Sequence, residues 1–115
     1  MDKRELLQKL FAINNLLKDM QHQEQQSDAA NRSNLQGYIF SVTQTLQKTV
    51  GLVISQMQIP LCEGSCASSE MMQARSLVCE ILKTGEHFQT KKHLENNDFI
   101  VEIQEIASEI CFKMS

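Results

Sequence analysis

Residues 6–20 have the sequence LLQKLFAINNLLKDM, in which apolar residues recur at intervals of four, three, four and three positions. The recurring residues are Leu6, Leu10, Ile13, Leu17 and Met20. A spacing near 3.5 residues puts one apolar stripe on a helix and favours coiled-coil-like packing against a neighbour. Asp2 and Glu5 precede the stripe in an arrangement close to a capping box. The sequence therefore predicts a helix over about 2–25.

The same periodicity returns after the polar stretch at 21–34. Its apolar residues are Leu35, Ile39, Val42, Leu46, Val50, Val53 and Met57. They predict a helix over 34–58, which ends before Pro60 because the residue preceding a proline is disfavoured in the α region. The β-branched residues of this segment suit strands, and Gly51 costs a helix about 1 kcal/mol relative to alanine. Strict alternation fails, however, because Ile39 and Phe40 are adjacent, and a helix is favoured.

Two further helices are predicted in the second half of the chain. The first covers 69–84, follows an exposed loop at 59–68, and ends at Thr84-Gly85; alternatively, the helix resumes through Phe88 to Leu94. The second covers 98–114, after the Asn96-Asn97-Asp98 cluster, which suits an N-cap. Together the patterns predict an all-α fold, an up-and-down bundle of about four helices in a single domain spanning 1–115.

Composition argues against several classes of partner. The net charge is −3 and the basic residues cluster at most in pairs, such as Lys91-Lys92, so nothing indicates nucleic-acid binding. No apolar run approaches the roughly 20 residues that cross a bilayer, and no signal peptide is recognisable. We therefore expect a cytoplasmic protein without a membrane partner, in which the four cysteines stay thiols.

No catalytic motif or cofactor-binding motif is evident in the sequence. It lacks a Gly-x-Ser-x-Gly turn, a phosphate-binding glycine loop and the paired acidic motifs that hold Mg²⁺ between helices. His87 does not fit the pattern of a phosphoacceptor, because Thr90 and Lys91 do not match the lysine and small residue expected in the next turn. The sequence thus predicts a protein that is not an enzyme and has no cofactor.

The cysteines are the most suggestive constellation for site chemistry. Cys62 and Cys66, with Cys79 further along and His87 or His93 in reach, could form a tetrahedral Zn²⁺ site or a redox pair. The C-x3-C spacing has no second pair to complete it. Cys79 could equally pack as a small apolar residue. Cys111, between two apolar neighbours, is predicted to lie in or near the core.

Acidic residues near the C-terminus recur at intervals of three, four, three and four. They are Glu95, Asp98, Glu102, Glu105 and Glu109. This row is typical of a solvated helix face. Alternatively it is a docking edge that speeds the encounter with a basic partner.

Four large side chains lie off the main apolar stripes and are predicted to be exposed contacts: Leu7, Phe11, Tyr38 and Phe40. They would pack against an amphipathic helix of another protein or against a second copy in a homodimer, with the acidic row orienting the partner. The leading hypothesis is a non-enzymatic protein-binding module, such as an adaptor, chaperone or small inhibitor. The alternative is a metal- or redox-responsive regulator that uses Cys62, Cys66 and Cys79.

Overall fold

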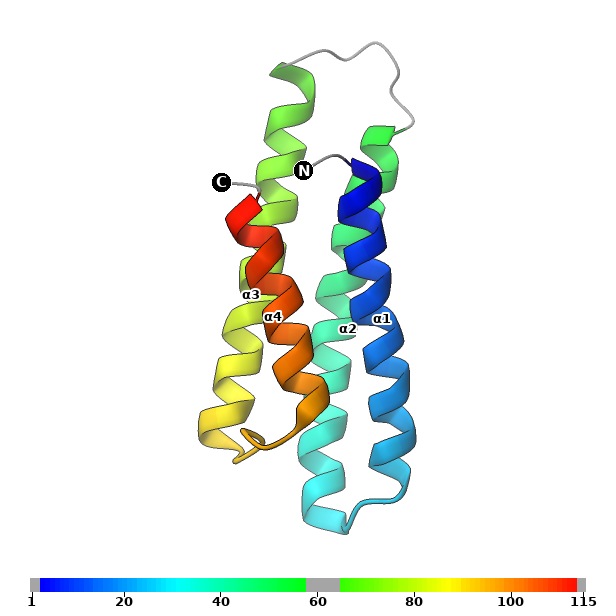
Figure 1. The fold of residues 1–115 in the computed structure, drawn as a ribbon, viewed down its shortest axis with the longest axis vertical. Coiled ribbons are helices and arrows are strands. Elements are labelled where there is room, and N and C mark those ends of the chain that lie inside the picture. Colours follow the sequence, from blue (N-terminus) through cyan, green and yellow to red (C-terminus); the bar gives the residue numbers. More distant parts are fainter. Residues whose placement is uncertain (1–2, 58–64, 114–115) are drawn as a thin grey trace.

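The computed structural model describes residues 3–57 and 65–113. They form four helices: α1 (Lys3–Gln25), α2 (Ala29–Met57), α3 (Ser65–Lys91) and α4 (Asp98–Lys113). Successive helices run in opposite directions along the long axis of the molecule (Figure 1). Within the described ranges there is no strand. The predicted all-α, up-and-down bundle of four helices is confirmed.

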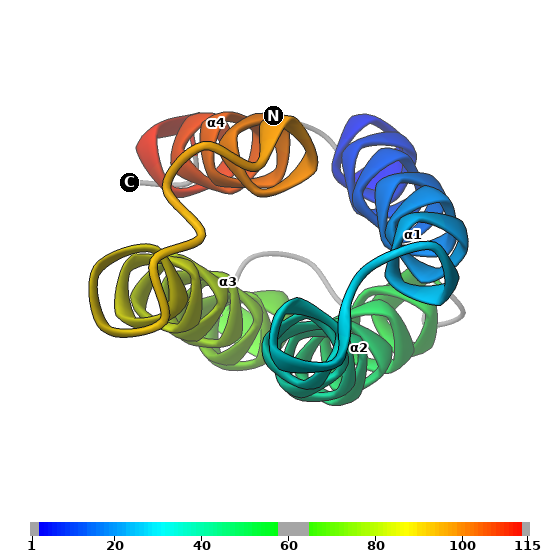
Figure 2. The same cartoon turned by 90° about the horizontal axis from the view of Figure 1, so that it is seen from below.

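The four helices surround a common centre when the molecule is viewed along its axis (Figure 2). Each helix packs against the next one in the sequence, and α4 closes the ring by packing against α1. Consequently α2 and α4 occupy diagonally opposite corners of the bundle. Helix α4 has 16 residues and is shorter than the other three, which have 23, 29 and 27.

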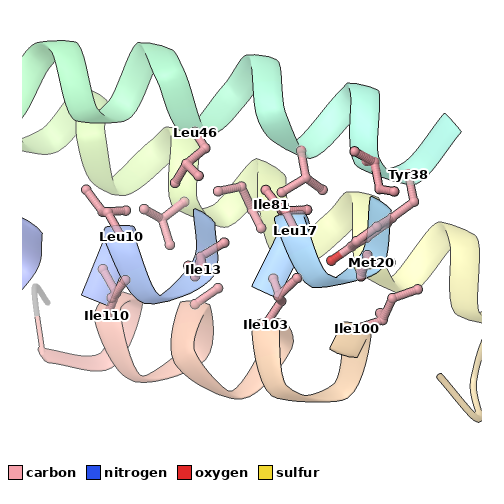
Figure 3. Close-up of a cluster of buried hydrophobic side chains, with 14 of the residues drawn as sticks. Leu10, Ile13, Leu17, Met20, Tyr38, Leu46, Ile81, Ile100, Ile103 and Ile110 are labelled. Atoms are coloured by element: carbon pink, nitrogen blue, oxygen red, sulfur yellow. The ribbon is translucent and has the colours of Figure 1, made fainter. Parts of the chain in front are cut away.

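The predicted apolar stripe of α1 faces the centre of the bundle. All five of its residues are buried, with at most 2% of their surface exposed. They meet an aliphatic face of α4 that includes Ile100, Ile103 and Ile110, together with Ile81 of α3 (Figure 3). Burying each such side chain contributes roughly 1.5–3 kcal/mol. The periodicity of the sequence thus accounts for the core.

The prediction that Tyr38 is an exposed contact is wrong, because its side chain is fully buried. Tyr38 lies three residues after Leu35 and four before Val42, so it faces the same way as these core residues. Its ring contacts Phe88 edge to face, with the ring centroids 5.7 Å apart (Figure 3 shows Tyr38 pointing inward). The buried face of α2 is therefore wider than the stripe through Ile39 alone.

Helix α2 begins earlier than predicted, at Ala29 rather than near residue 34. Asp28 caps it, because its Oδ1 accepts a hydrogen bond from the Asn31 backbone N–H at 2.9 Å. The start of α4 agrees with the prediction, and Asn97 Oδ1 accepts from the backbone N–H groups of Phe99 and Ile100.

Helix α3 is longer at both ends than the predicted 69–84. It includes 65–68, which were predicted as loop. The rest of the predicted loop, 59–64, lies outside the described residues. Gly85 does not end the helix, and its backbone lies against Gln104 of α4. The helix ends beyond it, at Lys91, where His93 has a φ of 60° and Leu94 N–H donates to the Phe88 carbonyl.

Candidate protein-binding surfaces

The outer side of the α1/α2 pair carries two neighbouring hollows. The first, of about 320 Å³, is lined by Phe11, Asn14, Leu46, Gln47, Val50 and Gly51. The second, of about 540 Å³, is lined by Gln21, Glu24, Gln25, Gln36, Ile39, Phe40, Thr43, Gln44 and Gln47. Gln47 lines both hollows, so they adjoin at this residue, and we call them together the α1/α2 groove.

Two aromatic side chains project into solvent at this groove. Phe40 has 64% of its surface exposed and Phe11 has 48%. Leu7 lies one turn before Phe11 but is half-buried and packs against the core. The predicted exposure is therefore found for Phe11 and Phe40 and only partly for Leu7. Their role as partner contacts stays a prediction.

Gly51 lies in the middle of α2 and lines the groove next to Phe11 and Val50. A Cβ atom added at Gly51 would have no neighbouring heavy atom within 4 Å. Since glycine costs a helix interior about 1 kcal/mol relative to alanine, a packing requirement would normally explain it. The described part of this chain supplies no such requirement, and Gly51 leaves open space on the outside of the bundle.

The groove is nearly free of charge. Glu24 is the one ionisable side chain among its described lining residues. Its Oε1 already accepts a hydrogen bond from Gln36 Nε2 at 2.7 Å and lies 3.8 Å from Arg32 Nε. The other polar lining residues carry amides or hydroxyls, which can both donate and accept hydrogen bonds. This surface suits an uncharged occupant.

The acidic row lies on the outer face of α4 and just before it. Glu95, Asp98, Glu102 and Glu105 are exposed. Glu109 is also exposed but is engaged, since its Oε1 lies 3.1 Å from both Lys9 Nζ and Lys113 Nζ. Hydrogen bonds from these two lysines lower the pKa of the Glu109 carboxyl.

The acidic row and the α1/α2 groove lie on different sides of the molecule. Helix α4 is diagonally opposite α2 (Figure 2), and none of the described residues that line the groove belongs to α4. The role of the acids in orienting a partner held between the first two helices stays a prediction, and it would have to act without direct contact in the groove. One short helix bound in the groove cannot also lie along the acidic row.

The cysteines predicted as metal ligands are only partly placed. Cys62 lies outside the described residues, and Cys66 is placed only by its backbone in the first turn of α3. Cys79 Sγ lies 3.3 Å from Sγ of Cys111, which is buried as predicted. Among the residues that the structure describes, no group of three metal-ligating side chains is suitably placed for an ion. The metal hypothesis remains a prediction.

The pairing of Cys79 with Cys111 was missed at the level of sequence. Cys79 follows the buried Val78, and Cys111 follows the buried Ile110. This position beside an apolar stripe was the one available sign that each cysteine lies near a helix contact. Local spacing cannot show which residues face each other across two helices.

The histidines lie apart from one another and at the surface. His22 is in α1, His87 is within α3 rather than after a break, and His93 follows α3; all three are exposed. The described helices include none with the length and apolarity needed to cross a membrane. Comparison with known protein families, known proteins and solved structures finds no match to this chain.

Proposed function

We propose that this protein is a non-enzymatic protein-binding module whose α1/α2 groove takes one amphipathic helix with an uncharged contact face. The observation that carries the proposal is a pair of adjoining hollows, bordered by two solvent-exposed phenylalanines and by a helical glycine at which an added Cβ would meet nothing within 4 Å. Exposed aromatic residues beside a hollow are typical of the few residues that dominate binding energy at interfaces.

The dimensions of the groove suit a helix. Along α2 it runs from Gln36 to Gly51, and at 1.5 Å per residue this distance is about 22 Å. A partner helix of about four turns covers that length. Its apolar residues would recur at intervals of three and four positions, so that they meet Phe11 and Phe40 from one side.

The charge of the groove restricts the occupant further. A charged side chain buried there would lose hydration without gaining a partner, which costs free energy. Glu24 offers little compensation because it is engaged by Gln36 and Arg32. We therefore expect leucine, phenylalanine, serine or amide side chains on the contact face, and charges only on its far side.

The test uses a displayed library of amphipathic helices about 16 residues long. Helices selected on the wild-type protein should bind the Phe11→Asp and Phe40→Asp variants at least about tenfold more weakly. Phe112→Asp is the matched control, because Phe112 is 83% exposed but lies on α4. Selected helices that bind all three variants equally, or that carry charges along the contact face, would show that the groove is not the binding site.

The remaining predictions are separate from this site. A cytoplasmic location is proposed because thiols persist there. The acidic row on α4 is proposed as an edge that speeds the approach of basic partners.

The alternative function is a regulator that binds a metal at Cys62, Cys66 and Cys79. It predicts a stoichiometric metal, detected by elemental analysis, that is lost in a Cys62→Ser variant.

A further inference from the structure

Helix α2 carries a second row of regularly spaced residues on its outer side. Phe40, Gln44, Gln47, Gly51 and Ile54 follow one another at intervals of four, three, four and three, and all are exposed. This is the period of a coiled-coil contact. Helix α2 therefore has one such face inside the bundle and another outside it.

The outer row is self-complementary in the antiparallel direction. If two copies of α2 lie antiparallel and Gln44 faces Gln47 of the second copy, the same register sets Phe40 opposite Gly51. The large ring then meets the one position of the row without a side chain. The two amides between them can each donate and accept a hydrogen bond.

The open space beside Gly51 fits this arrangement. A Cβ there would meet nothing within 4 Å, and the adjoining hollow of about 320 Å³ is walled by Phe11, Leu46 and Val50. The Phe40 ring of a second copy would fill this hollow with an apolar group. By two-fold symmetry the same contact forms twice in one dimer.

Charges do not oppose the pairing. The chain carries a net charge of −3, but its acidic row lies on α4, diagonally across the bundle from α2. Lys48 is the one charged residue of α2 between Phe40 and Ile54. In this register it faces Thr43 of the second copy, so no like charges meet between the two α2 helices over 40–51.

We propose that two copies of this chain pair through antiparallel α2 helices, with Phe40 of each seated over Gly51 of the other. This inference rests on the proposed function, since it names α2 of a second copy as the helix that the groove binds.

The proposal is tested by sedimentation equilibrium with four variants. Phe40→Ala and Gly51→Phe should each raise the dimer dissociation constant at least about tenfold. The double variant Phe40→Ala with Gly51→Phe should recover most of the affinity, because it only exchanges the large and small positions of the same layer. Phe112→Ala, on α4, should leave it unchanged.

Each other outcome overturns this register. A wild-type chain that stays monomeric at about 100 μM, far above common interface dissociation constants, excludes the pairing. A dimer that ignores Phe40→Ala uses another face, and a double variant no better than Gly51→Phe alone excludes the register. The proposed function is tested separately by selecting binding helices from the displayed library. That selection can be made on the wild-type protein whether or not it dimerises, so a failure of the dimer and a failure of the groove are distinguishable.

A different observation carries a second inference, at the α3/α4 contact. Cys79 of α3 and Cys111 of α4 have their Sγ atoms 3.3 Å apart. A disulfide requires about 2.05 Å, so the two sulfur atoms would have to approach by about 1.2 Å. Cys79 is half-buried, whereas Cys111 is only 8% exposed.

The two thiols differ in reactivity. Burial raises the pKa of the Cys111 thiol to about 12, its hydrogen bond with Cys79 acts in the same direction, and the Arg75 guanidinium partly opposes them. The thiolate is the attacking form. Cys79 is therefore the thiol that an external reagent meets first, and Cys111 is placed to react with it afterwards.

We infer that Cys79 and Cys111 form a dithiol site that is oxidised by a low-molecular-weight disulfide such as oxidised glutathione. Cys79 gives its proton to solvent and attacks one sulfur of the reagent, which releases one glutathione thiolate. Cys111 then gives its proton to that thiolate and attacks Cys79 Sγ, releasing the second glutathione. The two protein thiols lose two electrons, and the reagent is reduced to two thiols.

The test treats a Cys62→Ser/Cys66→Ser background with oxidised glutathione, so that the other two cysteines do not react. We expect a mass lower by two hydrogens, a peptide cross-link between 79 and 111, and a melting temperature higher by roughly 10 °C from closing the intervening loop. Adding Cys111→Ser should instead give a lasting glutathione adduct on Cys79. An adduct that persists on Cys79 without the added substitution, or no reaction at all, would refute the inference.

Discussion

Two mid-helix glycines show how differently the two halves of this bundle are packed. Gly85 of α3 is buried, and a Cβ added there would collide with the side chain of Gln104 on α4. Gly51 of α2 is exposed, and a Cβ added there would meet nothing within 4 Å. The same residue type thus permits a close contact inside the chain in one place and leaves a surface open in the other.

The surroundings of the two glycines differ in the same sense. Next to Gly85, Gln104 Nε2 donates to the Leu82 carbonyl at 3.0 Å, so α3 and α4 are joined through a buried amide. Next to Gly51, the exposed Phe11 borders a hollow. The α3/α4 contact is completed within one chain, whereas the α1/α2 groove presents apolar surface to another molecule.

The largest expected effect on stability comes from adding a methyl group at Gly85, in the α3/α4 contact. Gly85→Ala should lower the free energy of unfolding by about 2 kcal/mol, since the flexible end of Gln104 must move and give up its hydrogen bond with the Leu82 carbonyl, and an unpaired buried polar group costs about 1–3 kcal/mol. The measurement is urea unfolding followed by circular dichroism. Unchanged stability would mean that Gln104 can leave the contact freely, and the contrast with Gly51 would fail.

The interior of the bundle also contains a buried polar group without a hydrogen-bond partner. The Tyr38 hydroxyl is buried and has no hydrogen-bond partner among the described residues. Leaving such a group unpaired costs about 1–3 kcal/mol. Tyr38→Phe should therefore raise the free energy of unfolding by about 1.5 kcal/mol at neutral pH, with the Phe88 ring contact kept.

The pH dependence of this variant gives a second check. Burial raises the pKa of the Tyr38 phenol above its ordinary value of 10.0. The hydroxyl stays neutral in the folded state, so stability is retained below pH 10 and is lost as pH rises beyond it, where the unfolded state ionises. Tyr38→Phe should unfold less readily than the wild type at alkaline pH. An equal alkaline loss in both proteins would contradict this account.

A methyl group added at Gly51, in the α1/α2 groove, should change the stability in the opposite direction. Gly51→Ala should raise the free energy of unfolding by roughly 1 kcal/mol, because alanine is the better helix former and meets no neighbour. The measurement is made in a Phe40→Ser background at low concentration, so that self-association does not contribute. A loss of stability would show that Gly51 is required inside the chain.

Periodicity alone was sufficient to predict the four helices and most of the core. The stripe of α1 and the Asn97 cap of α4 are local signals, and the structure agrees with both. The exposed Phe11 and Phe40 were also predicted from their distance to the stripes.

The errors concern contacts between elements distant in sequence. Tyr38 was assigned to the surface because one stripe through Ile39 was taken to exhaust the buried face. Thr84-Gly85 indicates a helix end by its local sequence, whereas the contact of Gly85 with Gln104 is visible only in three dimensions. The groove and the Cys79–Cys111 pair likewise depend on which helices are neighbours, which helix periodicity does not specify.

The α1/α4 contact differs from both of the others because exposed ion pairs line its edge, and it gives the smallest expected effect. The lysines at Glu109 lower its pKa below the ordinary 4.5, so this carboxylate contributes stability above about pH 4.5 and loses it as pH falls through the folded-state pKa. Lys113, whose pKa is raised above 10.5 chiefly by its hydrogen bond with Glu109, contributes below that pH and loses its contribution as pH rises.

Glu109→Gln should therefore lower the melting temperature near neutral pH by only about 1–2 °C, and the difference from wild type should shrink below about pH 4 and in about 1 M salt. Glu102→Gln is the matched control, since Glu102 is exposed on the same helix and no described ion pair involves it. Equal shifts for the two variants would mean that general charge, rather than the contacts with Lys9 and Lys113, sets the effect. A shift as large as that of Gly85→Ala would mean that exposed ion pairs hold α4 as firmly as buried packing does.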